Sequence, residues 1–234
     1  MEPIRHIQSI RVKLVSLFVV VITVFLIAGG FIAIEVLSLR NLANDLTQEE
    51  FPKLRSIQEI LQSLNEAAEA THTALNHTHG ESLRSLEQSK EEFDQAATRF
   101  SLVTNALLFG SETEAFQNID DGMVADKWQQ TGIGQTITIQ PLTGVERQIA
   151  GEVVIFFGSF QNYATRAFDL KKELATLSSD TSEYVEYEQL FEQLEERIEH
   201  TQTKTGQLVK SLVFEIDRGV AQDAEQFDEA FDIL

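Results

Sequence analysis

Cysteine is absent from this chain of 234 residues, and proline occurs only three times. The lack of cysteine excludes disulfide bonds, thiolate metal sites and cysteine catalysis. Because proline breaks the interior of a helix, its scarcity permits long helices. The sequence also lacks a Gly-x-Ser-x-Gly nucleophile motif, a phosphate-binding loop and a zinc-binding helix motif. We therefore expect no enzymatic activity, no cofactor and no metal site.

Basic residues are scarce: 18 Lys and Arg stand against 37 Asp and Glu, which gives a net charge of −19. A surface of this charge repels nucleic acid, so we exclude nucleic-acid binding as a function. The charge is unevenly placed, because Arg5, Arg11 and Lys13 lie close together near the N-terminus. The head of the chain is thus positive and the remainder strongly acidic.

A long apolar stretch without a charged residue runs from Leu14 to Ile34. At a rise of about 1.5 Å per residue it spans roughly 30 Å, the thickness of a bilayer core. The positive-inside rule predicts residues 1–13 in the cytoplasm, a transmembrane helix at 14–34, and residues 35–234 outside the cytoplasm, in the periplasm of an inner-membrane protein. A cleavable signal peptide ending near Ala28-Gly29-Gly30 and a buried core helix are the alternatives.

The rest of the chain contains four apolar stripes with heptad spacing, which predict an all-α antiparallel four-helix bundle. Their members are Leu54, Ile57, Leu61, Leu64, Ala68, Thr71 and Leu75; then Leu86, Ser89, Phe93, Ala96, Phe100, Val103 and Leu107; then Ile149, Val153, Phe156, Phe160, Tyr163, Ala167, Leu170, Leu174 and Leu177; and finally Tyr187, Phe191, Leu194, Ile198, Thr201, Thr205, Leu208 and Leu212. The fourth stripe then steps through Ile216 to Val220, a stutter that unwinds a coiled coil locally.

Turn signals separate the four helices. Gly80 and Gly110 end the first two, and the pairs Ser111/Glu114 and Thr143/Glu146 have the spacing of capping boxes. The break before the fourth helix contains Ser179 and Asp180, either of which suits an N-cap. Residues 119–144 are expected to be an irregular insertion at the base of the bundle, with a short strand at 135–139 as the alternative.

The first helix, counted from residue 35 to 78, and the returning fourth helix are of similar length, so the chain ends near the level of the membrane. We expect the gene to continue into a second membrane helix, and a complete single-pass protein is the alternative.

The layout resembles the input half of methyl-accepting chemotaxis receptors and related membrane sensor kinases. The residues that carry the resemblance are Ser9 to Leu14 running into the membrane helix, Phe51-Pro52 in the first outer helix, and the stop from Ala106 to Gly110. The resemblance implies a ligand-sensing domain for chemotactic signal transduction, a homodimer, a small ligand bound between helices, and a final helix that shifts by an ångström or two.

Arginine is the residue type expected to anchor a small anionic ligand, such as an organic acid or the carboxylate of an amino acid. Arg84, Arg99 and Arg166 flank the stripes, and Tyr184 and Tyr187 could add hydroxyl groups. These five residues are the candidate ligand-binding residues, although surface arginines that balance the abundant acids are the plainer interpretation.

Other clusters do not have the spacing that metal sites need. His72, His77 and His79 lack the i, i+4 spacing of a helical zinc site, and the aspartates around Gly122 lack the EF-hand pattern. A membrane-anchored coiled-coil scaffold or adaptor of the cell envelope, with no small ligand, remains the alternative function.

Overall fold

The computed structural model describes residues 36–37, 40–41, 43–44, 46–76, 83–119, 123–130, 138–178 and 181–232. The chain divides into two compact units, Thr47–Val220 and Met1–Leu46 together with Ala221–Leu234. The core described below lies in the first unit. The predicted transmembrane helix at 14–34 lies outside the described residues. Within the described part of the chain, no helix combines the length and the apolar character that crossing a membrane requires.

The described residues form helices and contain no strand, so the predicted all-α class is confirmed. A π-helical turn, η1 (Leu46–Glu50), leads directly into α2 (Phe51–Leu75). The other elements, in order, are α3 (Leu83–Phe109), α4 (Glu114–Gln117), α5 (Met123–Gln130), α6 (Gly144–Leu174) and α7 (Ser182–Asp232).

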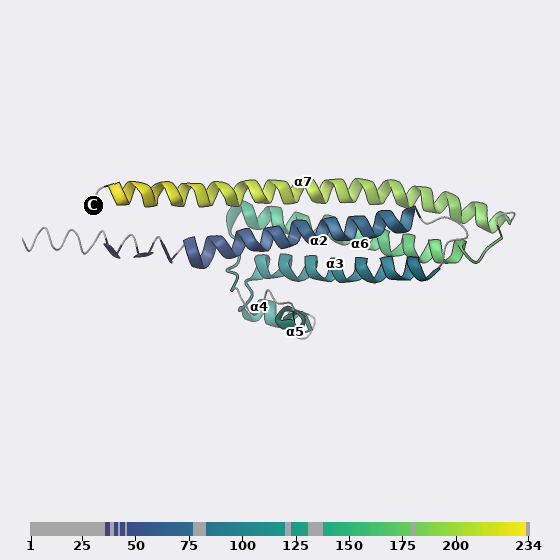
Figure 1. Cartoon of the computed structure of the whole chain (residues 1–234), viewed down its shortest axis with the longest axis horizontal. Helices are drawn as coiled ribbons and strands as arrows, with labels where there is room; N and C mark the ends of the chain where they lie inside the picture. Colours follow the sequence, from purple (N-terminus) through teal and green to yellow (C-terminus); the bar gives the residue numbers. More distant parts are fainter. Residues whose placement is uncertain are drawn as a thin grey trace, which may run out of the picture. The chain divides into compact units, whose positions relative to one another are not determined.

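The four long helices α2, α3, α6 and α7 contribute to one apolar core, and successive long helices run in opposite directions (Figure 1). Three cation–π contacts fix α7 against α6: Lys171 with Phe191, Arg197 with Tyr163, and Lys204 with Phe156. The last two contacts are one heptad apart on both helices, so the two helices keep a constant antiparallel register over this stretch.

The heptad stripes identify the core to different degrees. All seven predicted positions of α3 are buried, and α7 is buried at Phe191, Leu194, Ile198 and onward to Ile216. In α2 the stripe is partly confirmed, because Ile57, Leu64 and Thr71 are buried. Its other members, Leu54, Leu61, Ala68 and Leu75, are only partly buried, and the buried face also includes Ile60, Ser63, Ala67, Ala70 and Ala74, which the stripe left out. A bundle helix contacts two neighbours and needs a wider buried face than a two-position stripe provides.

The helix pair α3 and α6 is held by phenylalanine rings. Phe100 stacks on Phe157 with 3.6 Å between ring centroids, and Phe93 contacts both Phe160 and Phe168. The buried face of α2 consists instead largely of small or hydroxyl-bearing residues, namely Ser56, Ser63, Ala67, Ala70, Thr71 and Ala74. The buried face of α7 likewise includes Thr201 and Thr205, whose hydroxyls bond to carbonyls of their own helix. The other buried residues of α7 are large and apolar, so α2 is the helix whose packing differs from that of the α3/α6 pair.

Gly110 makes the sharp turn after α3. Its φ of +81° lies in the left-handed region, and a Cβ at this position would come within 2.8 Å of Pro141 Cδ. Its backbone N–H closes the helix on the carbonyl of Ala106 at 2.8 Å. Only glycine satisfies both the conformation and the close approach at this site.

The prediction that residues 119–144 are irregular is partly wrong, because Met123–Gln130 forms the helix α5. Trp128 of α5 is buried and contacts Phe116 of α4 edge-on, with 5.9 Å between ring centroids. Residues 138–143 are irregular as expected, and no strand occurs at 138–139; residues 131–137 lie outside the described part. In the sequence, Trp128 alone was too weak a signal to predict a helix of only eight residues.

The predicted caps need three corrections. Thr143 precedes α6, but its side chain makes no capping bond. Thr113, not Ser111, caps α4 by accepting a bond from the backbone N–H of Phe116, because both the N–H and the hydroxyl of Ser111 pair with Ile139. At α7 it is Thr181 whose Oγ1 accepts from the N–H of Tyr184, and Ser179 and Asp180 lie outside the described residues.

The end of the first helix is also earlier than predicted. α2 ends at Leu75, and Asn76 caps it with its N–H on the carbonyl of His72 at 3.0 Å. Gly80 and the histidines 77 and 79 lie outside the described residues. The stutter after Leu212 does not interrupt α7, which remains α-helical through that stretch.

Candidate functional site

Arg99 is the predicted ligand residue that the structure places beside open space. It lies on α3, and its Nη1 donates to Glu66 Oε2 of α2 at 2.9 Å. The second carboxylate oxygen of Glu66 accepts from Gln62 Nε2 at 2.8 Å, so both oxygens are engaged. The guanidinium has further N–H groups in a planar fork, which suit a carboxylate.

A groove of about 300 Å³ runs between α2 and α3 beside this ion pair. Its floor is made of small side chains, Ala70 and Ala96, which let the groove form between the two helices. Three carboxylates, those of Glu66, Glu69 and Glu92, face one guanidinium there; Thr73 and Gln95 complete the lining. The groove is therefore acidic with one basic anchor. Such a lining disfavours a dianion and suits a molecule that carries both an ammonium and a carboxylate group.

Arg99 also borders a second, more open groove of about 690 Å³ between α3 and α5. Its lining on α3 contains charges of both signs, from Glu87, Lys90, Glu91, Asp94 and Arg99, and α5 adds Lys127 and Gln130. Leu102, which is buried, forms part of its floor. Because acids and bases balance, this groove has no clear preference for a charge sign.

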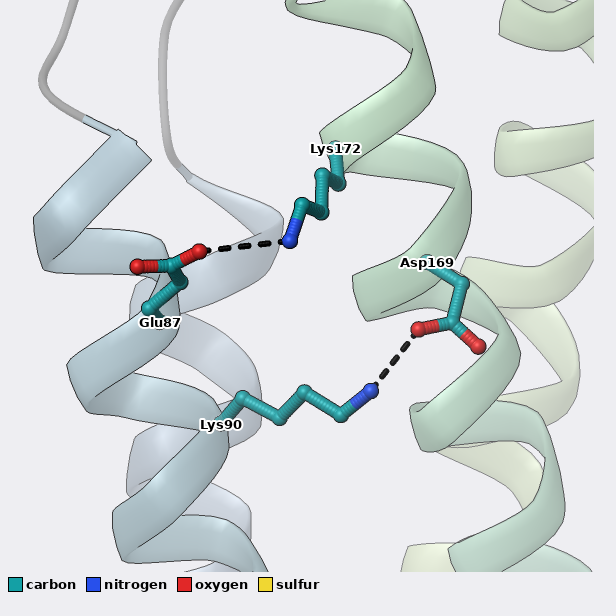
Figure 2. Close-up of polar contacts among 4 residues, drawn as sticks. All are labelled: Glu87, Lys90, Asp169 and Lys172. Atoms are coloured by element: carbon teal, nitrogen blue, oxygen red, sulfur yellow. Dashed lines mark hydrogen bonds and ion pairs between the residues drawn. The ribbon is translucent and has the colours of Figure 1, made fainter.

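Two ion pairs of opposite polarity join α3 to α6 at the far end of this surface (Figure 2). Lys90 Nζ lies 2.8 Å from Asp169 Oδ1, and Lys172 Nζ lies 3.2 Å from Glu87 Oε1. All four side chains are substantially exposed, so each pair contributes at most about 1 kcal/mol of stability. Glu87 and Lys90 are therefore engaged in ion pairs within the protein, with Lys172 and Asp169 respectively.

The other four predicted ligand residues lie away from Arg99. Arg84 is exposed in the first turn of α3, about 22 Å from Arg99 along the helix at a rise of about 1.5 Å per residue. Arg166 is exposed on α6. Tyr184 and Tyr187, in the first turns of α7, are half-buried and pack against the core. The structure thus does not gather the five residues into one site.

Tyr187 has a structural partner. The carboxylate of Glu173 on α6 raises the pKa of the Tyr187 hydroxyl, mainly through its charge and also through the hydrogen bond that it accepts; burial and the charges of Glu183 and Glu186 act in the same direction. The hydroxyl therefore stays protonated at neutral pH and links α6 to α7, which accounts for this residue without a ligand.

Sequence reasoning missed Glu66 as the partner of Arg99. The two residues belong to different helices, and their meeting depends on how α2 and α3 align across a turn that lies outside the described residues. Charged residues beside the stripes of α2 and α3 indicate that opposite charges face each other across the two helices. They do not identify Glu66 and Arg99 as the pair.

Comparisons with protein-family models, with curated proteins and with solved structures gave no match for this chain.

Proposed function

We propose that the chain is the ligand-sensing input region of a bacterial transmembrane chemoreceptor. In this proposal residues 14–34 cross the inner membrane, residues 35–234 lie outside the cytoplasm, and the bundle acts as a homodimer. The observation that supports the proposal is the unequal packing of the helices: phenylalanine stacking holds α3 to α6, whereas the buried face of α2 consists largely of small and hydroxyl-bearing residues.

The packing matters because signalling by such a bundle needs one helix to move while its neighbours stay in place. Interlocked large rings resist displacement, since every ångström of sliding loses contacts. Small side chains form low ridges, so a helix shift of about 1–2 Å requires less repacking. The unequal packing favours α2 as the helix that can shift and the α3/α6 pair as the fixed part.

The ligand in this proposal is an amino acid bound in the α2/α3 groove. Arg99 takes its carboxylate, and the acids Glu66, Glu69 and Glu92 take its ammonium group. An organic diacid would meet three carboxylates and one guanidinium, which disfavours it. Binding in a groove between two helices can move the bundle only if the ligand prefers one of two helix arrangements.

A thermal-shift screen of the full chain tests ligand binding. The probes are the common amino acids and a matched set of dicarboxylic acids. A ligand at one hundred times its Kd stabilises the folded state by about 2.7 kcal/mol, which is easily measured. We expect stabilisation by at least one amino acid, its loss in Arg99→Ala and its retention in Arg166→Ala, which removes an exposed arginine elsewhere. No shift with any compound would favour the envelope-scaffold alternative.

Topology has an independent test that uses the absence of cysteine. Single substitutions Gln8→Cys and Glu91→Cys are treated in intact cells with a maleimide that does not cross the inner membrane. Glu91 is exposed on α3, so its cysteine should react without inner-membrane permeabilisation, whereas Cys at position 8 should react only after it. The opposite pattern, or equal labelling of both, contradicts the proposed topology.

A further inference from the structure

Charged side chains from four helical elements, η1, α2, α6 and α7, lie near one another where α2 and α6 begin. We call Glu50, Lys53, Glu146, Glu215 and Arg218 the Glu146 cluster. Lys53 Nζ lies 2.6 Å from Glu50 Oε1, and these side chains are only 12% and 11% exposed. A nearly buried ion pair at a helix start is costly to desolvate, and other charges near it act through a low dielectric.

Glu146 projects from the first turn of α6 into this cluster. It is half-buried, and its Oε1 lies 4.0 Å from the point where a side chain at Gly219 of α7 would begin. The charges that act on it are Lys53 and Glu50 from the α2 side and Glu215 from α7. Glu215 is itself paired with Arg218, at 2.6 Å. The Glu146 carboxylate thus lies beside the α7 segment that contains Glu215 and Gly219, within range of the charges where α2 begins.

The charge balance of the cluster depends on the proton of Glu146. When Glu146 is ionised, three carboxylates share two cations, and the Arg218 side chain is 58% exposed and therefore screened by solvent. Burial raises the pKa of Glu146; Lys53 opposes the rise, and the carboxylates of Glu50 and Glu215 add to it. Protonation of Glu146 removes its repulsion with Glu50 and Glu215. It also gives Glu146 an O–H group that can donate a hydrogen bond to a neighbouring carboxylate.

We propose that Glu146 is a proton-controlled latch, which holds the α7 segment at Glu215 close to the starts of α2 and α6 when protonated and releases it when ionised. The groups that face Glu146 come from each neighbouring element: Glu50 from η1, Lys53 from α2, and Glu215 with its partner Arg218 from α7. The latch does not require a ligand in the α2/α3 groove, and it does not depend on the proposed sensor function.

Spin labels on the full chain measure the latch directly. The sequence has no cysteine, so the pair Gln148→Cys and Phe214→Cys gives two unique attachment points. Both residues are exposed, and they lie on α6 and α7 near the cluster. We expect the distance between labels, measured by double electron–electron resonance from pH 4.5 to 8, to increase through one transition. Glu146→Gln should abolish that transition and keep the short distance at every pH.

Matched variants separate the latch from a general charge effect. Glu152→Gln removes the same charge from an exposed position on α6 and should leave the transition unchanged. Lys53→Met should move the midpoint to higher pH, and Glu215→Gln should move it to lower pH. If Lys53→Met fails to fold, Glu215→Gln alone decides the direction. A distance that is constant over this pH range, or a transition that survives in Glu146→Gln, overturns the proposal.

Discussion

Phe100 of α3 and Phe157 of α6 lie face to face, with ring planes 14° apart. Both residues are almost completely buried, at 1% and 2% exposure. The stack joins the second and third long helices near the middle of the bundle, where truncation would leave a cavity that neighbouring backbone cannot fill.

Truncating either ring should therefore be severe. We expect Phe157→Ala to lower the free energy of unfolding by about 3–5 kcal/mol, measured by chemical denaturation. Phe214→Ala is the matched control, because that ring is 64% exposed, and it should change stability by no more than about 0.5 kcal/mol. A double-mutant cycle with Phe100→Ala should give a coupling of about 0.5–1.5 kcal/mol; zero coupling would mean that the stacking geometry contributes nothing beyond burial.

Two glycines should respond to alanine with opposite signs. Gly110 has a positive φ and no room for a Cβ beside Pro141, so Gly110→Ala should cost about 1–3 kcal/mol. Gly158 lies inside α6 with open space at the Cβ position, so Gly158→Ala should stabilise the protein by about 0.5–1 kcal/mol. Melting temperatures provide the measurement. Equal destabilisation by both changes would argue against the turn at Gly110.

Ser63 offers a test of an unsatisfied hydroxyl in the core. Its Oγ is buried and has no hydrogen-bond partner among the described residues, whereas Ser56 Oγ donates to the Pro52 carbonyl at 2.7 Å. Burial of an unpaired hydroxyl costs roughly 1–3 kcal/mol, so Ser63→Ala should stabilise the protein by about 1 kcal/mol. Ser56→Ala should be neutral or destabilising by about 1 kcal/mol. A loss of stability in Ser63→Ala would reveal a partner for that hydroxyl.

Stability should depend on pH through Glu146. Because burial raises its pKa above the ordinary value of 4.5, the folded protein holds this proton more tightly than the unfolded chain does. The resulting stabilisation is complete below the unfolded pKa and is lost as pH rises through the folded pKa. Glu146→Gln stays neutral, so its stability relative to the unsubstituted protein should grow with pH above about 4.5. Urea unfolding at several pH values measures this difference, and a difference that is flat with pH contradicts it.

Heptad periodicity predicted the buried face of a helix well where the stripe consists mainly of large apolar residues. α3 has large apolar residues at most heptad positions, and all seven proved buried. In α2 the stripe found the buried Ile57, Leu64 and Thr71, but most of the other buried positions hold serine or alanine, which also occur on surfaces, so the stripe missed them. Small residues carry little sequence signal although they decide how closely two helices approach.

The candidate site was less predictable. A single sequence offers three arginines as equal candidates, and only packing places Arg99 beside a groove and Arg84 and Arg166 on exposed faces. The Glu146 cluster could not be foreseen from spacing, since its members are distributed from Glu50 to Arg218. Glu146 itself was predicted as a capping residue, and its environment depends instead on Lys53 and Glu215 from other helices.

The pairing of Ser111 with Ile139 closes the base of the segment that carries α4 and α5. The only tryptophan of the chain, Trp128, belongs to this segment and is buried against Phe116. Intrinsic fluorescence therefore reports on this appendage, whereas circular dichroism is dominated by the four long helices. Comparing the two signals during denaturation distinguishes detachment of the appendage from melting of the bundle, with no label added to the protein.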